Sequence, residues 1–386
     1  MSRPIYLDYN ATTPAAPEAV AAMLPYLTDH FGNPSSSHAY GWTADEAVAQ
    51  ARERVAALLG AEPRSVTFTS GATEGVNLAL RGAAAVYGGR RHHLVTVATE
   101  HKAVLETCAA LERDGYEVTV LPIRRDGLLD LDRLAAAVTD KTMLVAVMWA
   151  NNETGVLQPI PEIAGIAHAH GALLMTDATQ AVGKVPVDVE AAGVDLLALS
   201  GHKLYAPKGV GALYVRARGP RVRLAPQLTG GGQEDGLRGG TLNVPGIVGL
   251  GVAAEVAAER LAADARRQRR LRDRFEAAIL DRVSGARVNG AEAPRLPNTS
   301  SIRFSRLTTA RLLPALRMVA AATGSACQTK TAQPSHVLTA MGLSREQSFG
   351  TVRFSLGRPT TEAEIDQAVE EVAEAVAAVR RANRAA

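Results

Sequence analysis

The sequence predicts an α/β fold: a mostly parallel seven-stranded sheet with helices on both faces, followed by a smaller α/β domain at the C-terminal end. From about residue 43 to 215, short runs rich in β-branched and apolar residues alternate with helical patterns, as is typical of such a sheet. A chain of 386 residues is also long enough for two domains. The predicted strands are Val66–Thr69, Leu94–Val97, Val118–Leu121, Met143–Trp149, Ala172–Thr176, Val194–Leu199 and Val210–Val215.

The helix ahead of the first strand has clear start and stop signals. Thr43 followed three residues later by Glu46 has the form of a capping box. An amphipathic stretch then runs to Leu59, and Gly60 is a typical helix stop. We therefore expect a helix from Thr43 to Leu59.

After the last predicted strand the pattern changes. A glycine-rich loop, Thr229–Thr241, precedes a long helix predicted over about Pro245–Val283. A charged amphipathic helix is predicted from Thr361 to the end of the chain. We expect two domains, a large one of residues 15–260 and a small one of residues 1–14 and 261–386.

The composition argues against several classes of partner. The net charge is only +3, from 42 basic and 39 acidic residues, so we expect no direct nucleic-acid binding. The densest basic run, Arg266–Arg274, is interpreted as the solvated face of a helix. No secretory leader and no apolar run of about 18 residues is found, so we expect no membrane association. The two cysteines, Cys108 and Cys327, suit a reducing cytoplasm.

Polar residues of catalytic type follow five of the predicted strands. In an open parallel sheet, ligands bind just beyond the carboxyl ends of the strands. One polar strand end would mean little, because a single lysine, histidine or aspartate there is usually a surface or capping residue. Five at the same edge predict an active site. The five segments are 70–74, 98–101, 151–153, 177–180 and 200–203.

The residues at these strand ends suit pyridoxal phosphate (PLP). The turn Ser70–Thr73 opens a helix, whose free N–H groups and positive end suit a phosphate, and Ser200 and His202 could add donors. Lys203 is the natural amine for a Schiff base with an aldehyde.

Three further residues at this edge suit the ring of the same cofactor. Asp177 could pair with a protonated pyridine nitrogen, which makes the ring an electron sink. Gln180 could reach the phenolic oxygen, and His101 could stack on the ring.

Seven motifs closely resemble the NifS-like cysteine desulfurases, which are fold-type-I PLP enzymes related to class V aminotransferases. The resemblance runs from YLDYNATTP (6–14) to TTEAEI (360–365), essentially the whole chain. The motifs are SGATE (70–74), TEHKAV (99–104), NNETG (151–155), DATQAVGK (177–184), SGHKLYAPKGVGALYV (200–215), GSAC (324–327) and RFSLGR (353–358).

The resemblance implies a role for each matching residue. Lys203 resembles the Schiff-base lysine, and His101 the stacking acid–base group. Asn152 and Arg353 resemble the groups that meet the ring and the substrate carboxylate. Cys327 resembles the cysteine that carries a persulfide. The remaining cofactor contacts implied are Asp177 at the pyridine nitrogen, Gln180 at the phenolic oxygen, and Ala72, Thr73, Ser200, His202 and the neighbouring subunit's Thr241 at the phosphate.

The activity implied is removal of sulfur from L-cysteine, giving L-alanine and a persulfide on Cys327 that passes to a sulfur-acceptor protein. A homodimer with shared active sites is implied as well. Cys108 shares a helical face with Val104 and Leu111, so we interpret it as a small buried hydrophobe. The segment after Cys327, QTKT (328–331), departs from the family's usual small residues. Iron–sulfur assembly, tRNA thiolation and DNA phosphorothioation all draw on such enzymes, and this departure favours a specialised pathway such as the last.

Other functions fit the sequence less well. A PLP-dependent aminotransferase or lyase would use the same cofactor residues but would not need Cys327, and a selenocysteine lyase stays open. Residues 249–254 satisfy GxGxxA, yet no strand precedes them, which indicates helix packing rather than a dinucleotide site. A non-catalytic scaffold would need neither Lys203 nor Asp177. No metal site is expected, because His168 and His170 face different ways on a helix with no cysteine pair nearby.

Overall fold

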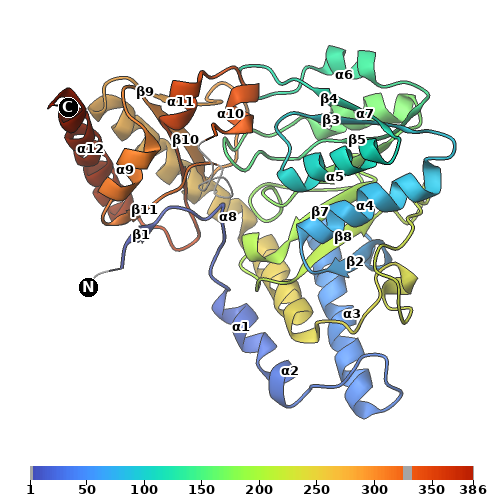
Figure 1. Cartoon of the computed structure of the whole chain (residues 1–386). Helices are drawn as coiled ribbons and strands as arrows, with labels where there is room; N and C mark the ends of the chain where they lie inside the picture. Colours follow the sequence, from blue (N-terminus) through green and yellow to red (C-terminus); the bar gives the residue numbers. More distant parts are fainter. Residues whose placement is uncertain (1–2, 325–332, 386) are drawn as a thin grey trace.

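A computed structural model describes residues 3–324 and 333–385 of the chain, and its main feature is a seven-stranded sheet (Figure 1). The strand order is β2-β8-β7-β6-β5-β3-β4, in which only β8 runs antiparallel to its neighbours. The predicted fold class is therefore confirmed, and every predicted strand has a counterpart. The strands are β2 (Val66–Thr69), β3 (His93–Val97), β4 (Glu117–Leu121), β5 (Thr142–Ala146), β6 (Leu173–Asp177), β7 (Leu196–Ser200) and β8 (Gly211–Val215).

Helices cover both faces of this sheet. The helices α4 (Ala72–Tyr87) and α5 (Lys102–Arg113) pack on one face. On the other face lie α3 (Ala39–Leu59), α7 (Ile160–Ala169) and the first half of α8 (Val244–Arg282). Because both faces are covered, the central strands are buried along their whole length, and this explains their continuous apolar runs.

The start of α3 differs from the prediction. The helix begins at Ala39, and the side chain of His38 caps it by accepting from the N–H of Gly41. Thr43 lies inside the helix, where its hydroxyl donates to the carbonyl of Ala39 at 3.0 Å. A hydroxyl bonded to its own helix cannot serve as the cap, so the predicted capping box is wrong. The predicted stop at Gly60 is confirmed by its φ of 65°.

Strand β5 is shorter than the predicted Met143–Trp149. It ends at Ala146, although the N–H groups of Val147 and Trp149 still donate to the carbonyls of Met175 and Asp177 at 3.0 Å. The chain thus follows β6 beyond the regular ladder and delivers residues 150–153 to the edge of the sheet.

The GxGxxA pattern of α8 serves helix packing, as expected. A Cβ atom on Gly251 would lie 2.6 Å from the Cα of Ala51 on α3, and one on Gly249 would lie 2.6 Å from the sulfur of Met23 on α1 (Pro17–Met23). Glycine at these positions therefore lets the helix backbones approach closely.

A second core forms around the C-terminal half of α8. It includes Phe275, Phe304 and Phe354 and is separate from the clusters that flank the main sheet. A three-stranded antiparallel sheet of order β12-β10-β9 lies within it, and β1 pairs with β11 in parallel. The bounds are β1 (Ile5–Tyr6), β9 (Ala286–Val288), β10 (Thr299–Phe304), α9 (Thr309–Ala315), β11 (Val319–Ala320), α10 (His336–Ala340), α11 (Arg345–Phe349), β12 (Thr351–Ser355) and α12 (Glu362–Ala385).

The basic run of α8 is only partly solvated. Arg270 and Arg274 reach across to Glu362 and Asp366 of α12, at 2.9 and 2.8 Å, from exposed positions. Arg272, in contrast, is buried, and donates to the carbonyl of Leu296 at 2.6 Å. The prediction of a solvated face is therefore wrong for Arg272, because the helix turns this position toward the second core.

The separate cores support our proposal of two domains that share α8 and divide near residue 260. Two short helices, α2 (Pro25–Thr28) and α6 (Leu131–Ala137), complete the large part. None of the helices in the described part of the chain combines the length and apolar character that crossing a bilayer demands.

Two glycine-to-alanine changes test the helix contact. Gly251→Ala should lower the free energy of unfolding by about 1–3 kcal/mol, because the new methyl group meets the backbone of α3. Gly165→Ala, in the exposed part of α7 where a Cβ meets nothing within 4 Å, should raise it by about 0.5–1 kcal/mol. Urea denaturation of both variants measures the difference, and equal effects would contradict the packing argument.

Candidate active site

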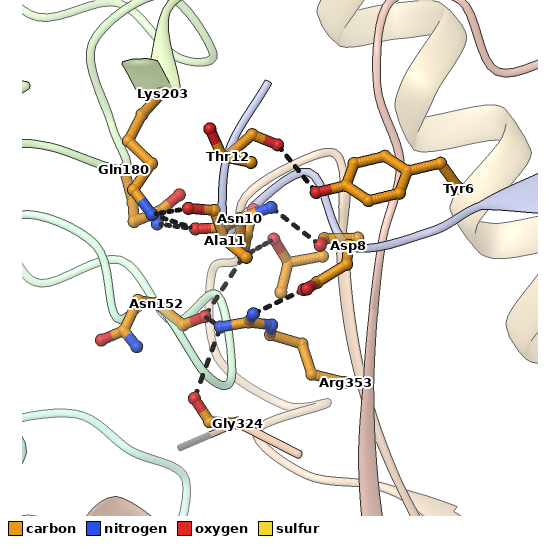
Figure 2. Close-up of polar contacts among 12 residues, drawn as sticks. Tyr6, Asp8, Asn10, Ala11, Thr12, Asn152, Gln180, Lys203, Gly324 and Arg353 are labelled. Atoms are coloured by element: carbon orange, nitrogen blue, oxygen red, sulfur yellow. Dashed lines mark hydrogen bonds and ion pairs between the residues drawn. The ribbon is translucent and has the colours of Figure 1, made fainter. Parts of the chain in front are cut away.

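The segment that follows β1, residues 8–13, lies at the carboxyl edge of the main sheet and gathers two of the predicted site residues. The carbonyl of Asn10 accepts from Nε2 of Gln180 at 2.9 Å and from Nζ of Lys203 at 2.6 Å (Figure 2). Lys203 also donates to the carbonyl of Ala11 at 2.5 Å. The structure thus brings the predicted lysine and glutamine together on one oxygen atom.

Asn10 itself is held from several sides. Its Nδ2 donates to Thr299 Oγ1 at 2.9 Å and to the carbonyl of Asn152 at 3.2 Å. Its Oδ1 accepts from Asn298 at 3.1 Å, and its backbone N–H donates to Ser355 Oγ at 2.9 Å. Sequence reasoning missed this residue, although the YLDYNATTP motif contains it. A buried asparagine bonded in this way fixes the backbone carbonyl that Lys203 uses.

Arg353 on β12 is a second point of convergence. Its side chain is only 3% exposed and pairs with Asp8 at 2.7 Å through one terminal nitrogen. The other terminal nitrogen donates to the carbonyls of Asn152 at 2.9 Å and Gly324 at 3.4 Å. Figure 2 shows the side-chain amide of Asn152 turned away from Arg353. The two predicted substrate-binding residues therefore meet, but through the backbone of Asn152.

The N-terminus of α4 forms a shallow cradle beside Ser200. Gly71 caps this helix with a φ of 154°, and within the described residues no side chain caps it. A Cβ atom on Gly71 would lie 3.4 Å from Ser200 Oγ, so glycine leaves room there. The backbone N–H groups of Ala72 and Thr73 lie at the uncapped start of α4, where the helix dipole is positive. This arrangement fits a phosphate group.

His202 lies on the side of this cradle that faces the N-terminal segment. Its Nδ1 is 3.1 Å from the hydroxyl of Thr12. Burial and the positive charges of Lys203 and Lys208 lower the pKa of His202 to about 4. The imidazole is therefore neutral near pH 7, and a neutral ring can donate one hydrogen bond to a phosphate oxygen.

Asp177 ends β6 and is 6% exposed. One of its oxygens accepts from the N–H of Thr179 at 3.0 Å, and the buried hydroxyl of Thr179 has no partner within the described residues. Glu100 lies nearby, and burial, followed by the charge of Asp177, raises the pKa of Glu100 well above its usual range. Burial thus favours the uncharged form of Glu100, whereas Asp177 closes β6 at the edge of the sheet, where a carboxylate can meet a cationic ring nitrogen.

His101 caps α5 and is exposed. Its Nδ1 accepts from the N–H of Ala103 at 3.1 Å, so the neutral ring carries its proton on Nε2. The turn before it is held by Asn151, whose Nδ2 donates to the carbonyl of Thr99 at 3.1 Å, and by His336, whose Nε2 lies 2.9 Å from the carbonyl of Glu100.

A buried carboxyl contacts both flanks of the segment that contains Cys327. The hydroxyl of Ser335 donates to Glu153 at 2.5 Å, and Gly324 lies so close to Glu153 that a Cβ would be 2.3 Å from its oxygen. Burial raises the pKa of Glu153. Cys327 itself lies outside the described residues, so its predicted role is carried forward as a proposal.

Two other predicted positions stand apart from this cluster. Thr241 is exposed on the loop that leads into α8. Cys108 is buried in α5 among apolar side chains, as expected, and burial raises its thiol pKa to about 12. A thiol so buried and so weakly acidic cannot supply a nucleophile near pH 7. The two neighbouring histidines of the α7 region, His168 and His170, contact different carboxylates, those of Asp195 and Asp140.

Comparison with known proteins gives a consistent result. The family described as aminotransferase class V matches residues 5–368. A curated relative from Anaeromyxobacter sp. (strain Fw109-5), named cysteine desulfurase IscS, is 52% identical over 381 residues, covering 98% of this chain and 94% of the relative. A solved NifS-like protein has a TM-score of 0.90 at 36% identity, covering 97% of this chain and 99% of that one. The crystal structure of DndA from Streptomyces lividans has a TM-score of 0.77 at 39% identity, covering 91% and 99%.

The depressed pKa of His202 predicts a pH-dependent contribution to stability. An unfolded histidine binds its proton near pH 6.5, whereas the folded site resists protonation down to about pH 4. The unfolded state therefore binds more protons in this window, and the stability of the wild type should fall as the pH is lowered from about 7 to 4. His202→Gln cannot titrate and should lose less stability. Urea unfolding of the PLP-free proteins in phosphate-free buffer checks this, and parallel curves for the two proteins would refute it.

Proposed function

This chain belongs to the class-V aminotransferase family and is a cysteine desulfurase, and from that premise we propose how its residues divide the reaction. The observation that carries the proposal is the convergence of Lys203 and Gln180 on the carbonyl of Asn10 at the carboxyl edge of the sheet. Asp177 closes the neighbouring strand, and Ser200 lies beside the N-terminus of α4. These groups together match the needs of one cofactor.

We propose that PLP is this cofactor, as is general in the family. Its phosphate would be held by the N-terminus of α4 (Ala72 and Thr73), Ser200 and His202, and its pyridine nitrogen by Asp177. The uncapped helix end, the space beside Gly71 and the buried carboxylate support this assignment. When bound, PLP supplies an electron-withdrawing ring that allows a proton to leave the α-carbon of an amino acid.

Arg353 is assigned to the carboxylate of L-cysteine. One terminal nitrogen is committed to Asp8 at 2.7 Å, whereas the other, among the described residues, donates to two neutral carbonyls, those of Asn152 and Gly324. A charged carboxylate competes well with neutral carbonyls for a guanidinium N–H. The second nitrogen is therefore the one that we assign to substrate, and Asp8 keeps the side chain in place.

The remaining steps move a proton and a sulfur atom. Lys203, whose amine lies at the edge of the sheet, would take the proton from the α-carbon of cysteine, and His101 would serve as the acid–base group for the substrate thiol. The thiolate of Cys327 would then attack the substrate sulfur, and the carbon–sulfur bond would break. The sulfur would stay on Cys327 as a persulfide, and L-alanine would be released. At an ordinary thiol pKa near 8.5, only about a tenth of a thiol is ionised at pH 7.5. A nearby base is therefore part of the proposal.

We also propose a homodimer that works in the cytoplasm and hands sulfur to an acceptor protein. A patch of large apolar side chains is exposed where α1, α2 and the start of α3 project from the body of the molecule (Figure 1). Exposed apolar patches of this kind mark protein interfaces, and a second copy of the chain is the occupant that would also place Thr241 at its neighbour's phosphate. The patch consists of Leu24, Leu27, Phe31, Tyr40 and Trp42. The specialised acceptor pathway, DNA phosphorothioation, stays a prediction.

Chemical labelling tests the assignment of Lys203. Borohydride reduction of the enzyme loaded with PLP should attach the cofactor covalently to one lysine, and peptide mapping should locate it at Lys203. Its amine is the one placed between the carbonyls of Asn10 and Ala11 at the sheet edge. Labelling at Lys184 or Lys208 in its place would reject the assignment.

The two cysteines form a matched pair for testing the sulfur step. Cys327→Ser should still bind PLP and cysteine but should release alanine at less than about a hundredth of the wild-type steady-state rate, because no thiol remains to accept sulfur. Cys108→Ser should retain nearly full turnover, since its thiol is buried and weakly acidic. Alanine production is the measurement. Wild-type turnover in the Cys327 variant would point to the aminotransferase or lyase alternative.

A further inference from the structure

Within the part of the chain that the structure describes, Lys184 is hydrogen-bonded to one active-site residue, Gln180. Its Nζ donates to Gln180 Oε1 at 2.8 Å and to the backbone carbonyl of the same residue at 3.1 Å. Both acceptors are neutral oxygens of a residue that is only 4% exposed. A partly buried ammonium bonded in this way acts mainly on the orientation of its partner.

The contacts of Gln180 allow only one orientation of its amide. Nζ of Lys184 keeps N–H groups in its charged and its neutral form, and it donates one of them to Oε1 at 2.8 Å. The carbonyl of Asn10 can only accept, so Nε2 must face Asn10, as the distance of 2.9 Å shows. If the amide turned over, its oxygen would face the carbonyl oxygen of Asn10, and the hydrogen bond from Lys184 to Oε1 would be lost. Lys184 thus selects the orientation that presents N–H groups toward Lys203.

The geometry places this N–H donor next to the reactive amine. Nε2 of Gln180 and Nζ of Lys203 share the carbonyl of Asn10, at 2.9 and 2.6 Å. An amide nitrogen carries two hydrogens, and one of them suffices for Asn10. The second hydrogen is therefore available for another acceptor close to Nζ of Lys203, such as an oxygen atom of a molecule that is bonded to this amine.

We propose that Lys184 is a positioning residue, which acts through Gln180 to keep an amide N–H directed at the phenolic oxygen of the bound cofactor. This inference rests on the proposed assignment of Lys203 and PLP. The neighbourhood is rich in positive charge: Lys203 and Arg353 face Lys184 from other elements, and Asp8 pairs with Arg353. Burial, together with these two cations, lowers the pKa of Lys184 to about 7, in keeping with its place inside the site.

The colour of the bound cofactor provides a readout other than turnover. When the bound cofactor loses its proton, negative charge is left unbalanced on the phenolic oxygen, and an N–H donor at that oxygen stabilises this form. Loss of the donor should therefore raise the pH midpoint of the visible absorbance change. For Lys184→Met, which keeps an unbranched side chain only one atom shorter but cannot donate, we expect a rise of about one pH unit, a tenfold change in proton affinity.

A double-mutant cycle distinguishes positioning from a direct effect of charge. Gln180→Leu alone should raise the midpoint at least as much as Lys184→Met does, and adding Lys184→Met to Gln180→Leu should change it little further. Lys184→Arg, which still donates, should raise the midpoint by less than half as much as Lys184→Met does. Lys141→Met removes an exposed lysine at the opposite edge of the sheet and should leave the midpoint unchanged.

Two results would overturn the proposal. If Lys184→Met shifts the midpoint equally in the presence and absence of Gln180, then Lys184 acts by its charge alone and positions nothing. If it shifts the midpoint no more than Lys141→Met, then Lys184 has no influence on the cofactor. Failure of the parent assignment gives a different result, because a wild-type enzyme that shows no visible absorbance with PLP would reject the cofactor itself. Thermal unfolding of each variant confirms that it is folded, and Lys184→Ala, which also lacks a donor, replaces Lys184→Met if the latter is not.

Discussion

The buried charge of Arg353 is the constraint on which the arrangement of the site depends. A guanidinium that is 3% exposed must have a charged partner, and this partner is Asp8, 345 residues away in the sequence. The pairing draws the N-terminal segment across the carboxyl edge of the main sheet. There the carbonyls of Asn10 and Ala11 face Lys203 (Figure 2). A contact between the two ends of the chain therefore positions a lysine near its middle.

Burial shifts the pKa of several ionisable groups around this segment. Burial favours the uncharged forms of Glu100, Glu153 and His202, each by moving its pKa in the direction expected for its type. In such a buried site, electrostatic interactions between charged and polar groups are stronger than they would be in water, because little solvent screens them. The contacts that orient Gln180 gain importance for the same reason.

The sequence predicted the parts of the molecule that depend on local pattern. The central strands of the main sheet were recognisable because strands covered on both faces are apolar throughout, and Cys108 was placed correctly by the helical face it shares with Val104. The start of α3 was predicted wrongly, because a histidine is a weaker sequence signal for a helix N-cap than the Thr43 and Glu46 pair, which has the form of a capping box. The contacts of Asn10 could not be predicted, because they join segments hundreds of residues apart that only the folded chain brings together.

Contacts between distant segments also hold the two flanks of the segment that contains Cys327, where the sequence departs from the usual pattern of its family. The flanks of that segment are held by residues of other elements: the carbonyl of Gly324 by Arg353, and the hydroxyl of Ser335 by Glu153. Glu153 follows Asn152, whose carbonyl binds both Arg353 and Asn10. The ends of the segment are thus tied to the substrate and cofactor residues, whatever lies between them. We propose that the residues after Cys327 vary with the acceptor protein while these flanks stay fixed.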